Sequence, residues 1–296
     1  MKNCIILICI SLLVAACGTS KNVAQQTETT TAVTQTGNTQ VTDATEETQQ
    51  VTQVMVNEME DKSNEDVVAV VEEEIEIEPS VIEAFDHTSW DGLLQKYISA
   101  EGNVNYSAFR NERNILQAYI VSLGENMPAE NWTKEDKLAY WMNAYNAMTV
   151  DLILRNYPLA SIKDIKDPWN QRLWKLGEKW YNLDEIEHKI LRKMGDPRIH
   201  FGINCASFSC PTIGPRAFTA QLVDEQLDWL AKNFINDTQR NTITENSVEI
   251  SKIFSWFAKD FKEEGTIIDF LNRYSDVTIN NKAKKSFKKY DWSLNE

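Results

Sequence analysis

The chain has 296 residues and a net charge of −14, and this charge is unevenly distributed. Residues 22–80 contain 14 acidic residues and one lysine, so the remainder is nearly balanced and the low isoelectric point carries no information about a substrate. A nucleic-acid-binding role, which requires a basic face, has no support. Glycine-rich phosphate loops are also absent, and we expect no cofactor.

The first seventeen residues have the pattern of a bacterial lipoprotein signal. Lys2 precedes an apolar run over residues 5–14 that is too short to span a bilayer, and the run ends in the motif VAAC at residues 14–17. We therefore expect residues 1–16 to be a cleaved signal peptide and Cys17 to be lipidated, which would anchor the protein stably in a membrane. Gly18 is not an acidic retention signal, which favours the outer membrane of the cell envelope and a domain that faces the periplasm. The alternative is an ordinary signal peptide with an incidental cysteine.

Residues 17–84 are rich in Thr, Gln, Val and Glu, and contain no aromatic residue. Such a segment cannot bury enough apolar area to offset the entropy of ordering it, so the sequence predicts a disordered acidic linker. From Phe85 the composition changes, and all nine tryptophans lie between Trp90 and Trp292. Residues 85–296 are therefore expected to form one globular domain.

Within this domain the predicted elements indicate an α+β fold, a single helix-rich domain with a small sheet. Helices are expected over residues 90–97, 107–123 (ended by Gly124), 134–156, 183–194 (ended by Gly195) and 219–235. A strand is expected over 198–204 and a hairpin over 241–250, followed by two short helices and a final strand. Thr133 and Asp136 approximate a capping box at the start of the longest helix, and Pro158 follows its end.

The predicted helix over residues 134–156 is apolar around nearly its whole circumference, as is typical of a buried helix. Asn143 and Asn146 lie within this surface, and a buried carboxamide needs specific hydrogen-bond partners. Two interpretations remain open. The asparagines either bond the backbone of neighbouring loops, or orient a catalytic or ligand group.

The helix over residues 183–194 places a carboxylate on its apolar side. Glu187 lies inside the stripe that contains Ile186 and Ile190, whereas His188 lies at its edge. Residues i and i+1 do not face each other on a helix, so Glu187 and His188 need other partners. The structural interpretation is a buried ion pair between Glu187 and Arg192 or Arg198, with His188 at the surface.

The segment over residues 198–211 runs from the predicted strand into a turn of small polar residues, a typical position for a nucleophile. Cysteine needs only a lowered pKa and a nearby base. Strand alternation places His200 and Cys205 on opposite faces, which makes His188 the better predicted base unless a bulge shifts the register.

Six phrases resemble the domain of unknown function 547 family, which is found in bacteria and plants. They are AYWMNAYNAMTV, NYPLASIKDI, LDEIEHKILR, DPRIHFGINCASFSCP, ISKIFSWFAKDF and YDWSLN, and the resemblance as a whole covers essentially Trp90 to Asn295 in order. The resemblance implies no particular activity. It implies that its defining motifs include Asn143, Asn146, Glu187, His200, Cys205, Ser207, Cys210 and Pro211, with His188 at a more variable position.

Three exclusive resting states are open for Cys205 and Cys210: a disulfide, a free nucleophilic Cys205, or two inert buried thiols. A zinc site from these cysteines with His188 and His200 matches no structural zinc spacing, and no metal is expected. The sharper hypothesis is a cysteine-dependent hydrolase or acyl transferase that acts on peptide or amide bonds. In it Cys205 is the nucleophile, a histidine is the base, and Asn143 or Asn146 orients a group or donates to the oxyanion. The alternative is a non-catalytic binding or scaffolding domain with a Cys205–Cys210 disulfide, and either could take an envelope peptide or protein as its ligand.

Overall fold

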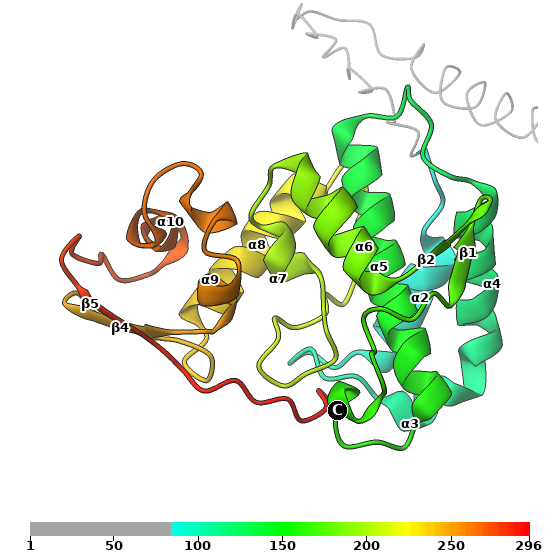
Figure 1. Cartoon of the computed structure of the whole chain (residues 1–296), viewed down its shortest axis with the longest axis horizontal. Helices are drawn as coiled ribbons and strands as arrows, with labels where there is room; N and C mark the ends of the chain where they lie inside the picture. Colours follow the sequence, from blue (N-terminus) through cyan, green and yellow to red (C-terminus); the bar gives the residue numbers. More distant parts are fainter. Residues whose placement is uncertain (1–83) are drawn as a thin grey trace, which may run out of the picture. The chain divides into compact units, whose positions relative to one another are not determined.

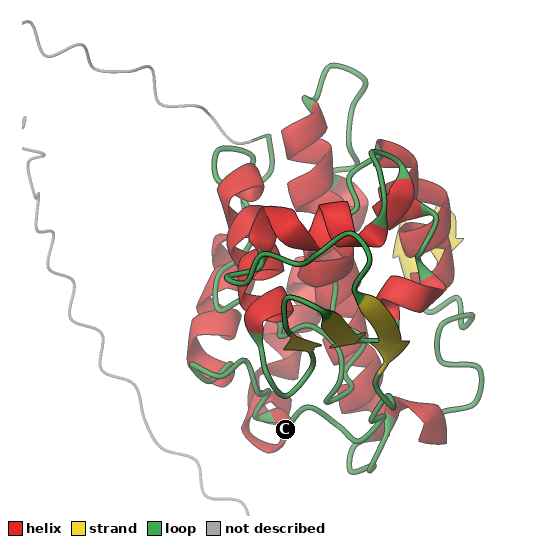
Figure 2. Ribbon diagram, turned by 90° about the vertical axis from the view of Figure 1, so that its left-hand side faces the viewer, coloured by secondary structure: helices red, strands yellow, loops and turns green. Residues whose placement is uncertain are grey.

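The computed structural model describes residues 84–296, and the predicted signal peptide, Cys17 and the linker up to residue 83 lie outside the described residues. Residues 84–296 form a helix-rich domain with small sheets, which confirms the predicted fold class (Figures 1 and 2). No helix in this part of the chain combines the length and hydrophobicity needed to cross a membrane.

The α-helices are α2 Thr88–Tyr97, α3 Tyr106–Phe109, α4 Arg113–Glu125, α5 Lys134–Asn156, α6 Leu183–Glu185, α7 Ile199–Gly202, α8 Val223–Asn236, α9 Ile253–Trp256 and α10 Ile267–Tyr274. Short 3₁₀ turns are η1 Arg110–Glu112, η2 Ile162–Asp164, η4 Leu191–Met194 and η5 Asp260–Lys262, and η3 Ile186–Ile190 is a π-helical turn. The strands are β1 Trp174–Leu176, β2 Lys179–Tyr181, β3 Thr242–Ile243, β4 Ser247–Ile250 and β5 Lys284–Phe287.

The strands make two separate sheets. The predicted hairpin is confirmed as β3 and β4, which pair antiparallel, and the predicted final strand is β5, which pairs parallel to β4. The antiparallel pair β1 and β2 was not predicted, because each strand has only three residues and neither shows a clear alternation.

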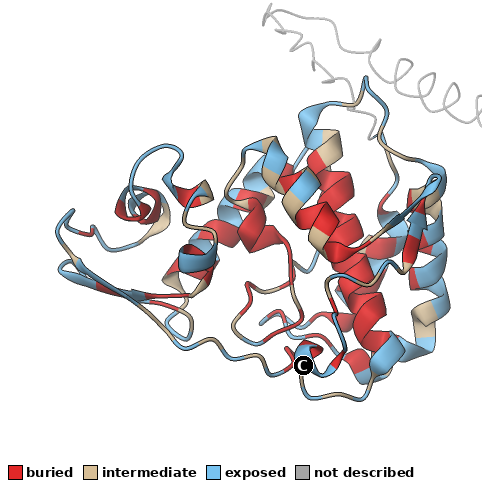
Figure 3. Ribbon diagram, viewed as in Figure 1, coloured by how far each residue is buried: buried red, intermediate tan, exposed pale blue. Residues whose placement is uncertain are grey.

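Helix α5 is the centre of the domain. The predicted capping box is present, since Thr133 and Asp136 each accept the other's backbone N–H at 3.0 Å. Every residue from Leu138 to Leu154 is buried, which confirms the prediction from its all-round apolar surface (Figure 3). Helix α5 contacts α4, α8 and the helical segment that contains η3 and η4, so residues on α5 can reach the loops on several sides.

Gly124 does not end the predicted second helix but lies inside α4. A side chain there would place its Cβ 2.7 Å from the Lys175 carbonyl oxygen, so glycine permits the close approach of β1. The Gly177 N–H donates to the Gly124 carbonyl at 2.8 Å and fixes this contact. Helix α8 begins at Val223, after a turn at Thr219 in which the Leu222 N–H bonds the Thr219 carbonyl.

The strand predicted over residues 198–204 is wrong. Its first part is the short helix α7, whose four residues are all buried, and only its end is extended. The helix is initiated by Asp196 and Pro197: the Asp196 carboxylate accepts the Arg198 N–H at 2.9 Å, and proline is well suited to a first helical turn. Alternation over so short an apolar run does not distinguish a strand from a buried helical turn.

The helical segment from Leu183 to Met194 has the predicted extent but is not a regular α-helix. It passes from α6 through the wider π-helical turn η3 and the narrower 3₁₀ turn η4. Gly195, with φ 70°, ends it in the left-handed conformation, as predicted. Glu187 and His188 both lie in the π-helical turn, a feature that is often found at functional sites.

Candidate functional site

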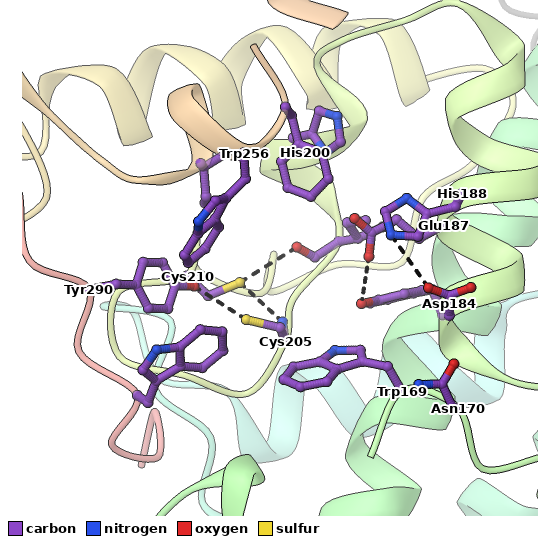
Figure 4. Close-up of a pocket in the computed structure, with 15 residues that line it drawn as sticks. Trp169, Asn170, Asp184, Glu187, His188, His200, Cys205, Cys210, Trp256 and Tyr290 are labelled. Carbon is purple, nitrogen blue, oxygen red and sulfur yellow. Dashed lines mark hydrogen bonds and ion pairs between the residues drawn. The ribbon is translucent and has the colours of Figure 1, made fainter. Parts of the chain in front are cut away.

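A cavity of about 340 Å³ gathers most of the residues that carry chemistry (Figure 4). Five of the predicted site residues line it: Glu187, His188, His200, Cys205 and Cys210. The other lining residues are Tyr145, Trp169, Asn170, Asp184, Ile203, Ile253, Trp256, Phe257, Tyr290 and Trp292. Residues from α5, η3, α7, α9 and the C-terminal segment therefore meet at one cavity.

The loop after α7 holds Cys205 in a tight turn. The Asn204 side chain is buried and spans this loop, since it accepts the Ala206 N–H at 2.7 Å and donates to the Pro211 carbonyl at 2.7 Å. Ala206 has φ 57°, a left-handed conformation that is uncommon for alanine and indicates local strain. The turn thus fixes the direction of the Cys205 side chain.

Several donors surround the Cys205 sulfur. The Ser207 and Tyr290 hydroxyl oxygens lie 3.0 and 3.3 Å from Sγ and 2.9 Å from each other. Cys205 donates its own N–H to Cys210 Sγ at 3.1 Å, and both cysteines are free thiols in the structure. Burial keeps the pKa of Tyr290 well above its ordinary value, so its hydroxyl remains available as a donor.

These surroundings give the thiols of Cys205 and Cys210 different pKa values. Hydrogen bonding from the Cys210 thiol lowers the pKa of Cys205 to about 7, with further help from the Ser207 and Tyr290 hydroxyls and against the effect of burial. Burial and the neighbouring Cys205 raise the pKa of the Cys210 thiol well above its ordinary value. At neutral pH Cys205 is therefore the cysteine that ionises, and Cys210 stays protonated.

Glu187 is a second ionisable group at the cavity, and the ion pair predicted for it is absent. Its carboxylate is buried and accepts the Tyr145 hydroxyl at 3.1 Å, whereas Arg192 pairs with Asp260 and Arg198 pairs with Asp196. Burial raises the pKa of Glu187 to about 7, although His188 and the Tyr145 hydroxyl act in the opposite direction. The nearby Cys205 also raises the pKa of Glu187.

Neither histidine hydrogen-bonds the Cys205 sulfur in the described part of the chain. The partly exposed His188 contacts Arg192 through Nδ1 at 3.0 Å and faces Asp184 through Nε2 at 3.6 Å. His200 is buried, stacks on Phe257 and bonds Asp260 through Nε2 at 2.8 Å, and its Nδ1 has no hydrogen-bond partner there. Burial lowers the pKa of His200.

Asn143 and Asn146 do not line the cavity, and their side chains form hydrogen bonds with backbone groups instead. Asn143 donates to the Phe218 carbonyl at 2.8 Å and accepts the Phe218 N–H at 3.0 Å. Asn146 donates to the Gly202 carbonyl at 2.9 Å and accepts the Asn204 N–H at 2.8 Å. Of the two open interpretations, the contacts match the one in which the asparagines bond neighbouring loops, and Asn146 holds the chain immediately before Cys205.

Sequence reasoning missed the phenolic and indole side chains of the site. Tyr145 and Trp256 lie in two of the quoted phrases, and Tyr290 and Trp292 lie in YDWSLN near the end of the chain, whereas Trp169 lies between two of the phrases. The C-terminal segment reaches the cysteine loop because the Phe208 N–H bonds the Ser293 carbonyl at 2.7 Å. The available signal was the concentration of aromatic residues in the quoted phrases, but each ring also suits a core position.

No group of three or more His, Cys, Asp or Glu side chains within residues 84–296 is arranged to hold a metal ion. Residues 129–235 match the family described as "Protein of unknown function, DUF547", so the chain contains a DUF547 domain over this range. The match includes Tyr145, Glu187 and both cysteines but not Tyr290. No curated protein and no solved structure matches the chain.

Proposed function

We propose that the domain is a cysteine-dependent hydrolase or acyl transferase that acts on amide or peptide bonds, with Cys205 as its nucleophile. The observation that carries the proposal is the position of the half-buried Cys205 sulfur at an aromatic cavity, within reach of the Ser207 and Tyr290 hydroxyls. Donors around a sulfur stabilise the thiolate, and the thiolate is the reactive form of cysteine.

Glu187 replaces the histidines as the proposed proton carrier. It lines the same cavity, and its pKa of about 7 lets it hold or release a proton at neutral pH. His188 and His200 are instead engaged with Arg192 and Asp260, and we propose that they support the wall of the cavity.

The two steps of the reaction need these groups, the substrate, and water or an acceptor amine. First, the Cys205 thiolate bonds to the substrate carbonyl carbon, the carbon–nitrogen bond breaks, and the Glu187 carboxyl donates its proton to the departing amine, directly or through one water. Next, water or an acceptor amine attacks the thioester and its proton passes to the Glu187 carboxylate. The carbon–sulfur bond then breaks and Cys205 leaves as a thiolate.

Alkylation of the full chain by iodoacetamide from pH 5 to pH 9, with peptide mapping of the product, tests the nucleophile. We expect Cys205 to react at pH 6 to 7 with a midpoint near 7, and Cys210 to lag far behind. The Tyr290→Phe variant should move the midpoint upward, because a donor to the thiolate is lost. In addition, p-nitrophenyl acetate should leave an acetyl group on Cys205 that mass spectrometry detects, and Cys205→Ser should not become labelled in this way. Slow and equal alkylation of both cysteines would contradict the proposal.

Non-catalytic binding in the same cavity is a second candidate, favoured by the absence of a histidine partner for Cys205 among residues 84–296. In its oxidised form a Cys205–Cys210 disulfide occupies both sulfurs. This candidate predicts no native alkylation until a reductant releases both thiols together, with a loss of stability of about 2 kcal/mol by the loop-entropy relation.

We also propose that the protein is a lipoprotein of the cell envelope, anchored through Cys17 in the outer membrane and facing the periplasm. The motif VAAC at residues 14–17 and the short apolar run before it support this location. An envelope peptide or protein is then the expected substrate or ligand. Cys17→Ser should abolish incorporation of labelled fatty acid and membrane fractionation, and retention of both would refute the anchor.

A further inference from the structure

The charged groups that line the cavity are acidic or titratable. Asp184 and Glu187 supply carboxylates and His188 and His200 supply imidazoles, whereas no lysine or arginine is among the described residues that line it. Arg192 is nearby, but its guanidinium is bound to Asp260 by two hydrogen bonds of 2.6 and 2.7 Å. The cavity therefore offers no fixed cation to an anionic substrate.

Aromatic rings form much of the remaining wall. Trp256, Tyr290 and Trp292 contact one another with ring centroids 4.6 to 5.8 Å apart, and Trp169 packs edge-on against Trp292 at 5.8 Å. Faces of indole and phenol rings attract cations through their quadrupole, with tryptophan the strongest. Lys163 already lies 4.9 Å from the Trp292 ring centroid, and it is not among the residues that line the cavity.

The Asp184 carboxylate lies at the Trp169 end of this wall and has no cationic partner of fixed charge among residues 84–296. Its Oδ1 lies 3.6 Å from His188 Nε2, too far for a hydrogen bond, and its side chain is 42% exposed. The Asp184 N–H bonds the Trp169 carbonyl at 3.1 Å, which holds the backbones of the two residues together, and both residues line the cavity. Figure 4 shows Asp184, Asn170 and Trp169 together on one side of Cys205, with Tyr290 on the other.

We infer that the substrate carries a positively charged amine, which binds at Asp184 and the Trp169 ring while the reacting carbonyl lies at Cys205. This inference rests on the proposed function and adds the substrate class: an amide or peptide with an ammonium group next to the acyl portion. A carboxylate and an aromatic face together satisfy an ammonium ion better than either alone. A substrate with an anionic group at the same place would meet Asp184 without compensation.

Three iodoacetamides with the same reactive group test the inference on the full chain. Their N-substituents are trimethylammonioethyl, hydroxyethyl and sulfonatoethyl, and the rate of Cys205 alkylation at pH 7 and low salt is compared with that of the urea-unfolded chain. We expect the cation-to-anion rate ratio to be about ten-fold or more higher in the native protein, as for an electrostatically focused site. Asp184→Asn and Trp169→Leu should each lower this ratio by about three-fold or more. The matched control Asp276→Asn, an exposed aspartate that does not line the cavity, should leave it unchanged.

The outcomes distinguish a failure of the cationic substrate from a failure of Cys205 as the nucleophile. Equal native and unfolded ratios, with fast alkylation by the neutral reagent, would overturn the cationic substrate and leave the nucleophile intact. The wild-type ratio decides this even if a variant fails to fold. Lack of reaction with all three reagents at pH 7 would overturn Cys205 as the nucleophile, and the inference with it.

Discussion

Cys205 and Glu187 have pKa values moved toward the same range by different causes. Donors to the sulfur bring the pKa of Cys205 down to about 7, and burial brings the pKa of Glu187 up to about 7. The pKa of each group therefore lies near neutral pH, where a reaction can begin with a thiolate and a protonated acid.

The buried carboxyl of Glu187 should make stability depend on pH in a defined direction. Its pKa is near 4.5 when unfolded and about 7 when folded, so the folded state holds more protons between these values. The free energy of unfolding therefore falls as pH rises from about 4.5 to 7. Glu187→Gln lacks this penalty, and by pH 7 it should gain on the order of 3 kcal/mol relative to wild type, compared with its value at pH 4.5. Urea unfolding at the two pH values measures the difference.

Glu185, two residues earlier, gives a control of opposite sign. It pairs with Arg172 and Lys179, which hold its pKa below the ordinary value against the effect of burial. Its stabilising contribution is therefore present above pH 4.5 and is lost as pH falls, so Glu185→Gln should destabilise the domain at pH 7. If the two variants show the same pH trend, Glu187 is not a carboxyl with a raised pKa.

At the scale of elements, α5 holds the loops of the site through its two buried asparagines. No strand within residues 84–296 pairs with the backbone before Cys205, and the Asn146 side chain instead hydrogen-bonds the Gly202 carbonyl and the Asn204 N–H. Asn143 does the same for Phe218. One helix thereby fixes two distant segments of the chain, which gives the Cys205 loop a rigid support.

Asn143→Ala and Asn146→Ala should each destabilise the domain by about 1 to 3 kcal/mol, because two buried backbone groups lose their partner. Asn143→Asp should be worse at neutral pH, since the carboxylate cannot donate to the Phe218 carbonyl and adds a buried charge. Asn146→Ala should also slow native alkylation of Cys205 relative to Asn143→Ala, because it releases the Cys205 loop. Unchanged urea midpoints for both alanine variants would show that these hydrogen bonds contribute nothing to stability.

Elements with strong local signals could be predicted from the sequence, and elements decided by their neighbours could not. Helix α5 has a capping box and an apolar surface on all sides, and Gly195 and the β3–β4 turn are local as well. Helix α7 forms because of the turn at Asp196 and the hydrogen bond from Asn146 to Gly202. The alternation of apolar and polar residues over 198–204 indicates neither contact. The three-residue strands β1 and β2 pair through a backbone contact that Gly124 permits.

The same distinction holds at the site. Glu187 was found because a carboxylate stood in an apolar stripe, and Cys205 because a thiol followed an apolar segment into a polar turn. The Tyr145 hydroxyl that replaces the expected arginine, and the Tyr290 hydroxyl at Cys205, come from 42 and 85 residues away along the chain. No local pattern indicates contacts over such separations.

At the scale of the whole molecule, the C-terminal segment completes the site. Asn295 accepts the Tyr106 hydroxyl at 2.9 Å, the Leu294 N–H bonds the Ala160 carbonyl at 2.9 Å, and Ser207 and Leu294 form an isolated antiparallel bridge. These contacts join the beginning, middle and end of the described chain around the Cys205 loop. Because the matched family segment ends at residue 235, four aromatic residues that line the cavity, Trp256, Phe257, Tyr290 and Trp292, lie outside it.

Removal of the two ends of the chain should therefore have different effects on its melting temperature. The segment before Val81 is acidic and aromatic-free, so a chain that begins at Val81 should melt at the same temperature as one that begins at Gly18. A chain without residues 290–296 loses Tyr290, Trp292 and the buried Leu294 and Asn295, and its melting temperature should fall by at least several degrees. For a domain of this size a loss of about 1 kcal/mol lowers the melting temperature by roughly 2 to 4 °C, which calorimetry resolves. A comparable fall on removal of the acidic segment would mean that it packs on the domain, contrary to its composition.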